Sequence, residues 1–126
     1  MYELMTRRAI PCPPKLSLER RPSLARGEVM ALARLYKCLA NPTRVRLLYE
    51  IARAGEQHVS ALCDLTRMKP QAVSNQLRGL SRLGIVATRR NGKQIYYSIA
   101  DPCVPALLYR WLCLVEDAAQ RRRRGK

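Results

Sequence analysis

Apolar residues recur with helical spacing along the first part of the chain. They form one stripe over residues 28–40, which predicts a first helix there. Asn41 and Pro42 then restart the chain, because Asn is a favoured N-cap and Pro suits the first helical position. A second helix is therefore expected from residue 42 to about Gly55, a residue type common at helix ends.

Two shorter helical patterns follow, separated by a tight turn at residues 67–69. A third helix is predicted over residues 60–66 with Ser60 as its N-cap, and a fourth over residues 70–83. Two helices joined by so short a turn have the layout of a helix-turn-helix, whose second helix enters the major groove of DNA. The fourth helix is therefore a candidate recognition helix.

The hydrophobic pattern becomes an extended one after the fourth helix. Two extended runs flank Asn91-Gly92, a strong hairpin signal because both positions of such a turn need a positive φ. Asp101-Pro102 then starts a last helix, expected over residues 102–120, with a broad apolar face. Four helices, a hairpin and a fifth helix, in the order α-α-α-α-β-β-α, predict a mainly α winged helix-turn-helix fold.

The chain is strongly basic. It has 126 residues, enough for one domain, and its 24 Lys and Arg against 9 Asp and Glu give a net charge of +15. Such a charge points to a polyanionic partner, with nucleic acid the first candidate and an anionic membrane surface the second. No apolar run approaches the ~20 residues that span a bilayer, and no export signal is visible. A cytoplasmic protein that does not bind membranes is expected.

Charge and proline content divide the chain into three parts. Residues 1–27 form a basic, Pro-containing arm that is expected to be partly disordered. Residues 28–120 form the domain that is expected to bind DNA and to dimerise. Residues 121–126 form a basic tail that is expected to fray from the last helix. This tail either only solubilises the end of the chain or contacts DNA phosphates.

Two groups of polar side chains are candidates for DNA contact. Amide, hydroxyl and guanidinium groups on the outward face of the fourth helix suit base edges, whereas cations at the hairpin tip suit phosphates. Either group alone is also typical of a solvated surface, but the two in succession are typical of a winged helix. The candidates are Lys69, Gln71, Ser74, Asn75, Gln76 and Arg78 on the helix and Arg89, Arg90, Asn91, Gly92 and Lys93 on the hairpin.

Three segments resemble a known family in their order and spacing. The segments are LANPTRVRLLYEI, AVSNQLRGLSRLGIV and RRNGKQIYYSIAD. They resemble the ArsR/SmtB family of dimeric winged-helix repressors, and the resemblance covers residues 29–117. It implies a homodimer built on the first and last helices, bound to an inverted-repeat operator in double-stranded DNA and released by an inducer. The expected dimer surface comprises Leu32, Leu35, Leu107, Leu108, Trp111 and Leu112.

The chain departs from this family in the turn of the helix-turn-helix. Arg67 stands where members usually have Gly, and Lys69 stands where a Ser usually caps the recognition helix. Pro70 can still start that helix. Both departures add positive charge near the expected DNA surface.

Two metal sites of the family are incomplete here. Residues 56–62 match the metal motif of the third helix without its two thiols, so that only His58 is left as a ligand. In the zinc site of the last helix, Asp101, Cys103 and Asp117 match in position, but Leu114 replaces the second His. Neither metal site is expected to be intact.

The cysteines are candidates for a different kind of sensor site. Their odd number and the lack of a CxxC pair predict reduced thiols rather than a disulfide framework. Either they are small core residues, or at least two of them sense soft ions such as As(III) or Cd(II). Cys103 and Cys113 lie about 15 Å apart along one helix, so a shared site would need the partner subunit or Cys38. The candidates are Cys12, Cys38, Cys63, Cys103 and Cys113.

The sequence favours a regulatory DNA-binding protein over an enzyme. It has one His, and neither a Gly-rich phosphate loop nor a Ser/His/Asp set is visible. The leading interpretation is a homodimeric, sequence-specific transcriptional repressor, released from its operator by a thiol-reactive metal or metalloid ion or another thiol-directed signal. The alternative is a winged-helix nucleic-acid-binding protein without an inducer, constitutive or architectural.

Overall fold

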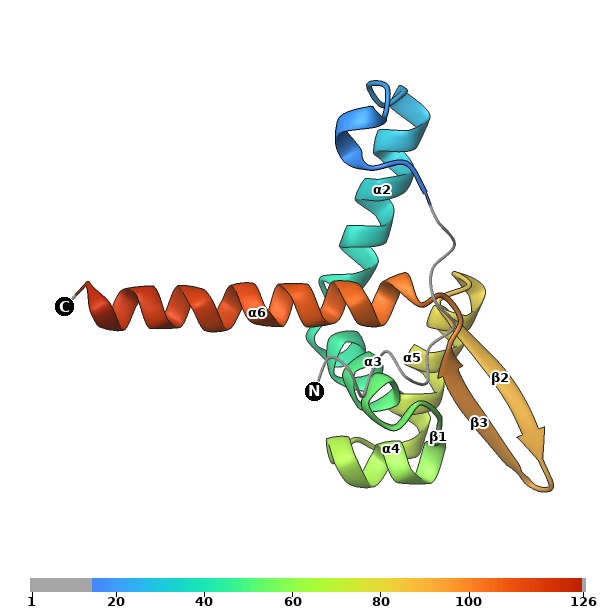
Figure 1. The fold of residues 1–126 in the computed structure, drawn as a ribbon. Helices are drawn as coiled ribbons and strands as arrows, with labels where there is room; N and C mark the ends of the chain where they lie inside the picture. The colour runs from blue at the N-terminus through green and yellow to red at the C-terminus, as the bar shows by residue number, and fades with distance from the viewer. Residues whose placement is uncertain (1–14, 126) are drawn as a thin grey trace.

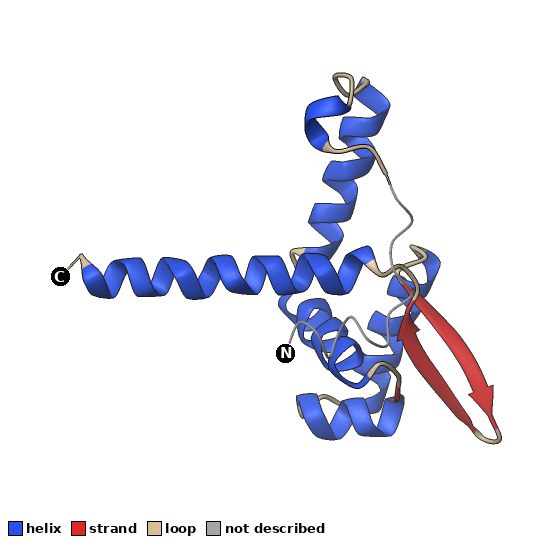
Figure 2. Cartoon of the chain, viewed as in Figure 1, coloured by secondary structure: helices blue, strands red, loops and turns tan. Residues whose placement is uncertain are grey.

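The computed structural model describes residues 15–125, which form five α-helices, one 3₁₀ turn and a three-stranded antiparallel sheet. The elements are η1 (Leu18–Arg20), α2 (Arg26–Leu39), α3 (Pro42–Ala54), β1 (Gln57–His58), α4 (Val59–Thr66), α5 (Pro70–Arg82), β2 (Val86–Asn91), β3 (Gln94–Ile99) and α6 (Cys103–Arg124). This order confirms the predicted winged helix-turn-helix. The short strand β1 was not predicted, and it pairs with β3, so that the sheet has the order β1-β3-β2. The two long strands form a hairpin that extends from the helical body (Figure 2).

Local side-chain bonds fix the starts of the first two long helices. Asn41 Oδ1 accepts from the backbone N–H groups of Thr43 (2.9 Å) and Arg44 (3.2 Å), which confirms Asn41 as the N-cap of α3. Helix α2 begins slightly earlier than expected, where the Glu28 carboxylate accepts from the backbone N–H of Ala25 (3.0 Å).

Two predicted helix ends are wrong. The N-cap of α4 is His58 rather than Ser60, because His58 Nδ1 accepts from the backbone N–H of Ala61 (3.2 Å). Strand β1 brings His58 to this position, and a two-residue strand leaves little periodic signal. Helix α6 continues to Arg124, so the arginines of the tail extend the last helix instead of fraying beyond residue 120.

The hydrophobic core lies where α3, α4 and α5 pack against one another and against the base of the hairpin. Its buried side chains are Leu47, Leu48, Ile51, Leu62, Val73, Leu77, Leu80, Ile85, Val86, Tyr97 and Val104. Removing this apolar surface from water stabilises the fold at about 25 cal/mol per Å². Within the described residues, α2 contributes no fully buried side chain and α6 contributes only Val104.

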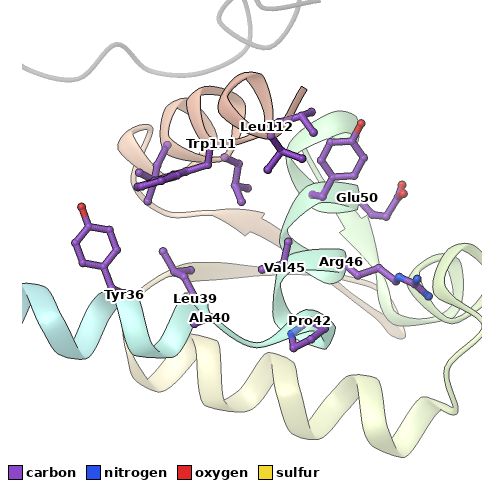
Figure 3. Close-up of a pocket in the computed structure, with 13 residues that line it drawn as sticks. Tyr36, Leu39, Ala40, Pro42, Val45, Arg46, Glu50, Trp111 and Leu112 are labelled. Carbon is purple, nitrogen blue, oxygen red and sulfur yellow. The ribbon is translucent and has the colours of Figure 1, made fainter. Parts of the chain in front are cut away.

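Helices α2 and α6 project from this body in different directions (Figure 1). A groove of about 700 Å³ lies between α2, α3 and α6. Trp111 and Leu112 of α6 face Leu39 and Val45 across this groove (Figure 3). In the single chain, Trp111 is still 50% exposed and Leu112 38% exposed. Such a contiguous apolar surface on a small domain is typical of a subunit interface.

None of the helices within residues 15–125 combines the length and the apolar character that a membrane span requires.

Candidate nucleic-acid interface

The turn between α4 and α5 depends on a left-handed residue. Arg67 has φ 56° and ψ 32°, a conformation that glycine adopts at little cost and other residues adopt rarely. This left-handed conformation explains why members of the family usually have Gly at this position. Thr66, directly before it, is buried, and its hydroxyl donates to the Leu62 carbonyl (2.6 Å). The turn keeps the helix-turn-helix geometry although Arg replaces Gly.

Helix α5 starts without a side-chain cap. Lys69 is its N-cap residue and makes no capping hydrogen bond, and Pro70 occupies the first turn. The uncapped backbone N–H groups and the helix dipole make this end positive, and Lys69 adds a charge. The start of α5 is therefore suited to an anionic group such as a phosphate.

The two faces of α5 differ sharply in polarity. Its buried face consists of Val73, Leu77 and Leu80. Its exposed side chains include Gln71, Asn75 and Arg78, whose spacing puts them on one side of the helix, and Ser74 is half-buried beside them. Arg78 donates to Asn75 Oδ1 (3.3 Å), so two of the predicted base-reading groups contact each other.

Gln76 is placed differently from its predicted neighbours. It is half-buried, and its Oε1 accepts from Arg44 Nε of α3 (3.0 Å). The helical spacing predicts Gln76 among the outward residues and does not single out Arg44. The only sequence signal for Arg44 is its place within the segment LANPTRVRLLYEI.

The hairpin turn differs from the predicted one. Asn91 pairs with Gln94, so Gly92 and Lys93 are the two turn residues rather than Asn91 and Gly92. Only Gly92 has a positive φ, at 64°. A Gly at the first central position is typical of a type II′ turn, which needs a positive φ at that residue alone. Arg90 and Lys93 remain exposed at the tip, as expected.

Arg89 lies two residues before the tip pair Asn91–Gln94 and is bound to a carboxylate beside the hairpin. Its guanidinium bonds both carboxylate oxygens of Glu56 (2.6 and 3.0 Å) and lies 4.9 Å from the ring centroid of Tyr96. His58 packs edge-on against the same ring, with the centroids 5.5 Å apart. The hydrogen bonds from Arg89 lower the pKa of the Glu56 carboxyl below its usual value. No sequence pattern points to Glu56 as the partner of Arg89, because the two residues are 33 positions apart.

The candidate dimer residues lie on α2 and α6. Leu32 and Leu35 on α2 are exposed, as are Trp111 and Leu112 on α6. Leu107 and Leu108 are half-buried, and Leu108 also packs against the core.

The cysteines fall into two groups. The four cysteines within residues 15–125 form no disulfide, and Cys12 lies outside the described residues. Cys38 and Cys63 are half-buried and pack against the core. Cys103 and Cys113 lie on α6, exposed and half-buried respectively.

The residues that match the last-helix zinc motif do not gather into a site. Within the described part of the chain, no group of three His, Cys, Asp or Glu side chains is arranged to hold a metal ion. Asp101 instead accepts a hydrogen bond from the backbone N–H of Cys103 (2.8 Å), which lowers the pKa of its carboxyl. Asp101 thus serves the start of α6 in a single subunit.

Comparisons with known proteins agree with this geometry. A model of the MarR family matches residues 41–94, from the N-cap of α3 to the start of β3. A Staphylococcus aureus protein named as a homolog of the cadmium resistance transcriptional regulatory protein CadC is 34% identical, over 68% of this chain and 70% of its own length.

Two solved structures extend the likeness over most of the chain. The crystal structure of AntR, an antimony-specific transcriptional repressor, is 44% identical, with a TM-score of 0.75 over 87% of this chain and 99% of its own. The homodimeric winged helix-turn-helix DNA-binding domain of a possible ArsR-family regulator from Mycobacterium bovis is 29% identical, with a TM-score of 0.67 over 80% of this chain and 95% of its own. The chain therefore belongs to the ArsR/SmtB family of homodimeric, DNA-binding winged-helix transcriptional repressors.

Proposed function

We propose that this repressor reads its operator with the exposed face of α5. The observation that carries the proposal is the polar, acid-free face formed by Gln71, Asn75 and Arg78. Asn and Gln suit adenine, and Arg suits guanine, in the major groove. Ser74 and Gln76 border this face, and Lys69 contacts a phosphate at the start of the helix.

The wing supplies phosphate contacts from its tip. Arg90 and Lys93 lie at the tip beside Asn91 and Gly92 and meet the DNA backbone beside each half-site. Arg89 anchors the wing by pairing with Glu56, and this ion pair keeps the Arg89 guanidinium from contacting the phosphates.

Replacing Glu56 with Gln tests this assignment of the wing. We expect Glu56→Gln to strengthen binding to any duplex, because Arg89 then reaches the backbone. The plot of log affinity against log salt should steepen by about 0.9 for each phosphate gained. Fluorescence anisotropy over a salt series measures this slope, and Glu116→Gln on α6 is the control with the same charge change. An unchanged slope in Glu56→Gln contradicts the role of Glu56.

The same pair has a defined dependence on pH. Since Arg89 lowers the pKa of Glu56, the ion pair contributes to folding above the ordinary carboxyl pKa. Its contribution is lost only as the pH falls through the lowered pKa. The wing is therefore anchored throughout the neutral range in which DNA binding is measured.

A dimer formed through α2 and α6 accounts for the exposed apolar side chains. The partner subunit covers the surface that includes Leu32, Leu35, Trp111 and Leu112. The two α5 helices then face successive major grooves of an inverted-repeat operator. The protein acts in the bacterial cytoplasm, where its thiols stay reduced.

The inducer is a soft, thiol-binding ion, like the cadmium and antimony that appear in the names of two similar proteins. As(III) and Cd(II) are the first candidates. Cys103 and Cys113 stand at equal distances on either side of Leu108 on α6. When two helices cross antiparallel at a two-fold axis, residues equally far from the crossing point are neighbours. A crossing at the level of Leu108 places Cys103 level with Cys113 of the partner subunit, which gives two candidate sites per dimer.

An ion held between the two α6 helices is linked to DNA binding by geometry. It fixes the relative position of the subunits and hence the spacing of their α5 helices. The operator is released when the ion-bound spacing fits the half-sites worse than the ion-free spacing does. Cys38 and Cys63 pack against the core, and Cys12 is a further candidate on the N-terminal arm.

The whole proposal is tested on DNA from just upstream of the protein's own gene. We expect the reduced homodimer to bind this duplex much more tightly than a scrambled one. Arsenite, antimonite or Cd(II) at stoichiometric amounts should then release it, whereas Zn(II) should not. Tight binding that no ion and no organic persulfide relieves would support a nucleic-acid-binding protein without an inducer. Equal affinity for both duplexes would contradict a sequence-specific repressor.

A further inference from the structure

Arg44, in the first turn of α3, contacts two other helices at once. Its Nε donates to Gln76 Oε1 on α5 (3.0 Å), and its Nη1 donates to Cys38 Sγ near the end of α2 (3.0 Å). The side chain is half-buried between these elements. One planar guanidinium thus joins a helix of the dimer surface to the recognition helix, in a fixed fork geometry that Lys cannot reproduce.

A glycine inside α5 makes room for this guanidinium. A Cβ at Gly79 would lie 3.2 Å from Arg44 Nη2, a tight contact that would make the guanidinium shift by a few tenths of an ångström. Gly in a helix interior is less favourable than Ala, so a position that holds it calls for a physical reason. Gly79 has helical rather than positive φ, and therefore its backbone conformation does not require glycine. The close approach of Arg44 is a reason for glycine at this position, because a methyl group there would displace the guanidinium.

We infer that Arg44 is a positioning residue, which sets the orientation of α5 relative to α2 and so fixes how the recognition helices of the dimer meet the two half-sites. The inference rests on the proposed reading of DNA by α5. It follows from the elements that Arg44 joins: α2 carries exposed apolar side chains of the candidate dimer surface, and α5 carries the candidate base-reading face. Contacts between such elements are what couples subunit arrangement to operator affinity.

Other arginines of α3 lack such contacts among the described residues. Arg53 pairs with Glu50 (3.3 Å) and lies 5.8 Å from the ring centroid of Tyr49, both on the same helix, and it is largely exposed, so its loss changes only local surface contacts within α3. Arg53→Lys is therefore the matched control for Arg44→Lys, since both changes keep the charge. Arg44→Lys removes the fork that bonds Gln76 and Cys38 together.

The first test compares these variants of the full-length homodimer on two duplexes. One is the sequence that the wild-type protein selects from a random duplex library, and the other is a scrambled version. Arg44→Lys should bind the selected duplex about tenfold more weakly, the scale expected for losing hydrogen bonds from a charged group. Its affinity for the scrambled duplex should match that of Arg53→Lys. Equal losses on both duplexes overturn the inference.

The second test uses non-additivity. If Arg44 acts through Gln76, the loss in Arg44→Lys/Gln76→Ala should be smaller than the product of the two single losses. Gly79→Ala should lower the melting temperature or leave it unchanged in the wild type, but raise it in Arg44→Lys, where space for the methyl group is available. Additive effects of Arg44 and Gln76, or the same effect of Gly79→Ala in both backgrounds, overturn the inference.

Failure of this inference is distinguishable from failure of the proposed function. Asn75→Ala/Arg78→Ala, measured on the same duplexes, tests the reading of DNA by α5 without involving Arg44. If this variant loses the preference while Arg44→Lys behaves like Arg53→Lys, only the positioning role is wrong. If Asn75→Ala/Arg78→Ala keeps the preference, α5 does not read the operator. The positioning role of Arg44 is then wrong as well.

Discussion

Replacing Asn75 and Arg78 together with Ala is expected to abolish the preference of the protein for its operator. Both side chains are exposed on one face of α5, and Arg78 orients Asn75 through a hydrogen bond of 3.3 Å. Each good contact to a base edge discriminates by about 1–3 kcal/mol. Losing both in each subunit should reduce the ratio of operator to scrambled affinity by roughly 100-fold or more. Anisotropy titrations of both duplexes measure the ratio directly.

The matched control for this variant is Arg82→Ala. Arg82 lies in the last turn of the same helix and is exposed, so its loss removes a positive charge without touching the candidate base-reading face. Arg82→Ala should lower the affinity for both duplexes by a similar small factor. Circular dichroism and sedimentation should show a folded dimer for both variants. An intact preference in Asn75→Ala/Arg78→Ala would refute the assignment of α5 as the reading helix.

Replacing Cys103 with Ser is expected to abolish release by the inducing ion while leaving operator binding intact. A hydroxyl is a poor ligand for soft ions, so the affinity for As(III) or Cd(II) should fall by about 100-fold or more. Cys113→Ser should have the same effect, because both thiols are needed for each site. Cys63→Ser is the control, since Cys63 packs against the core from α4. Release of the labelled operator during ion titration is the measurement.

Mixed dimers decide whether the site lies between subunits. A heterodimer of one Cys103→Ser subunit and one Cys113→Ser subunit loses both thiols from one shared site and keeps both in the other. Ion binding should therefore return at one ion per heterodimer, although neither homodimer binds. A site within one subunit predicts no recovery, because each subunit would then lack one thiol. Absence of recovery in a verified heterodimer would rule out the shared site.

Local signals along the chain determined the elements and the general class of partner. Asn41 and Pro42 start α3 as predicted, because capping and the fixed φ of Pro act within a few residues. The spacing of Val73, Leu77 and Leu80 marks the buried face of α5, and the excess of Lys and Arg indicates a polyanion. The motif order was enough to identify the family, and the comparisons confirm it.

The register of the hairpin could not be predicted from the sequence. The dipeptide Asn91-Gly92 predicted a hairpin correctly, but the register Asn91 to Gln94 moves the turn to Gly92 and Lys93. Register is set by which side chains of both strands face the core, so a dipeptide alone cannot fix it.

Only the tertiary structure decided what the polar side chains contact. Glu56 and Arg89 are 33 residues apart, and Arg44 and Gln76 are 32 apart, so neither pair leaves a periodic trace in the sequence. Their contacts exist because the packing of the core brings α3 against α5, and the hairpin against β1. The sequence by itself thus determined the five α-helices and the hairpin, though not β1, and that they bind DNA as a dimeric repressor. The packing of those elements decided which cations are held by protein groups and placed the Arg44 guanidinium against Gly79.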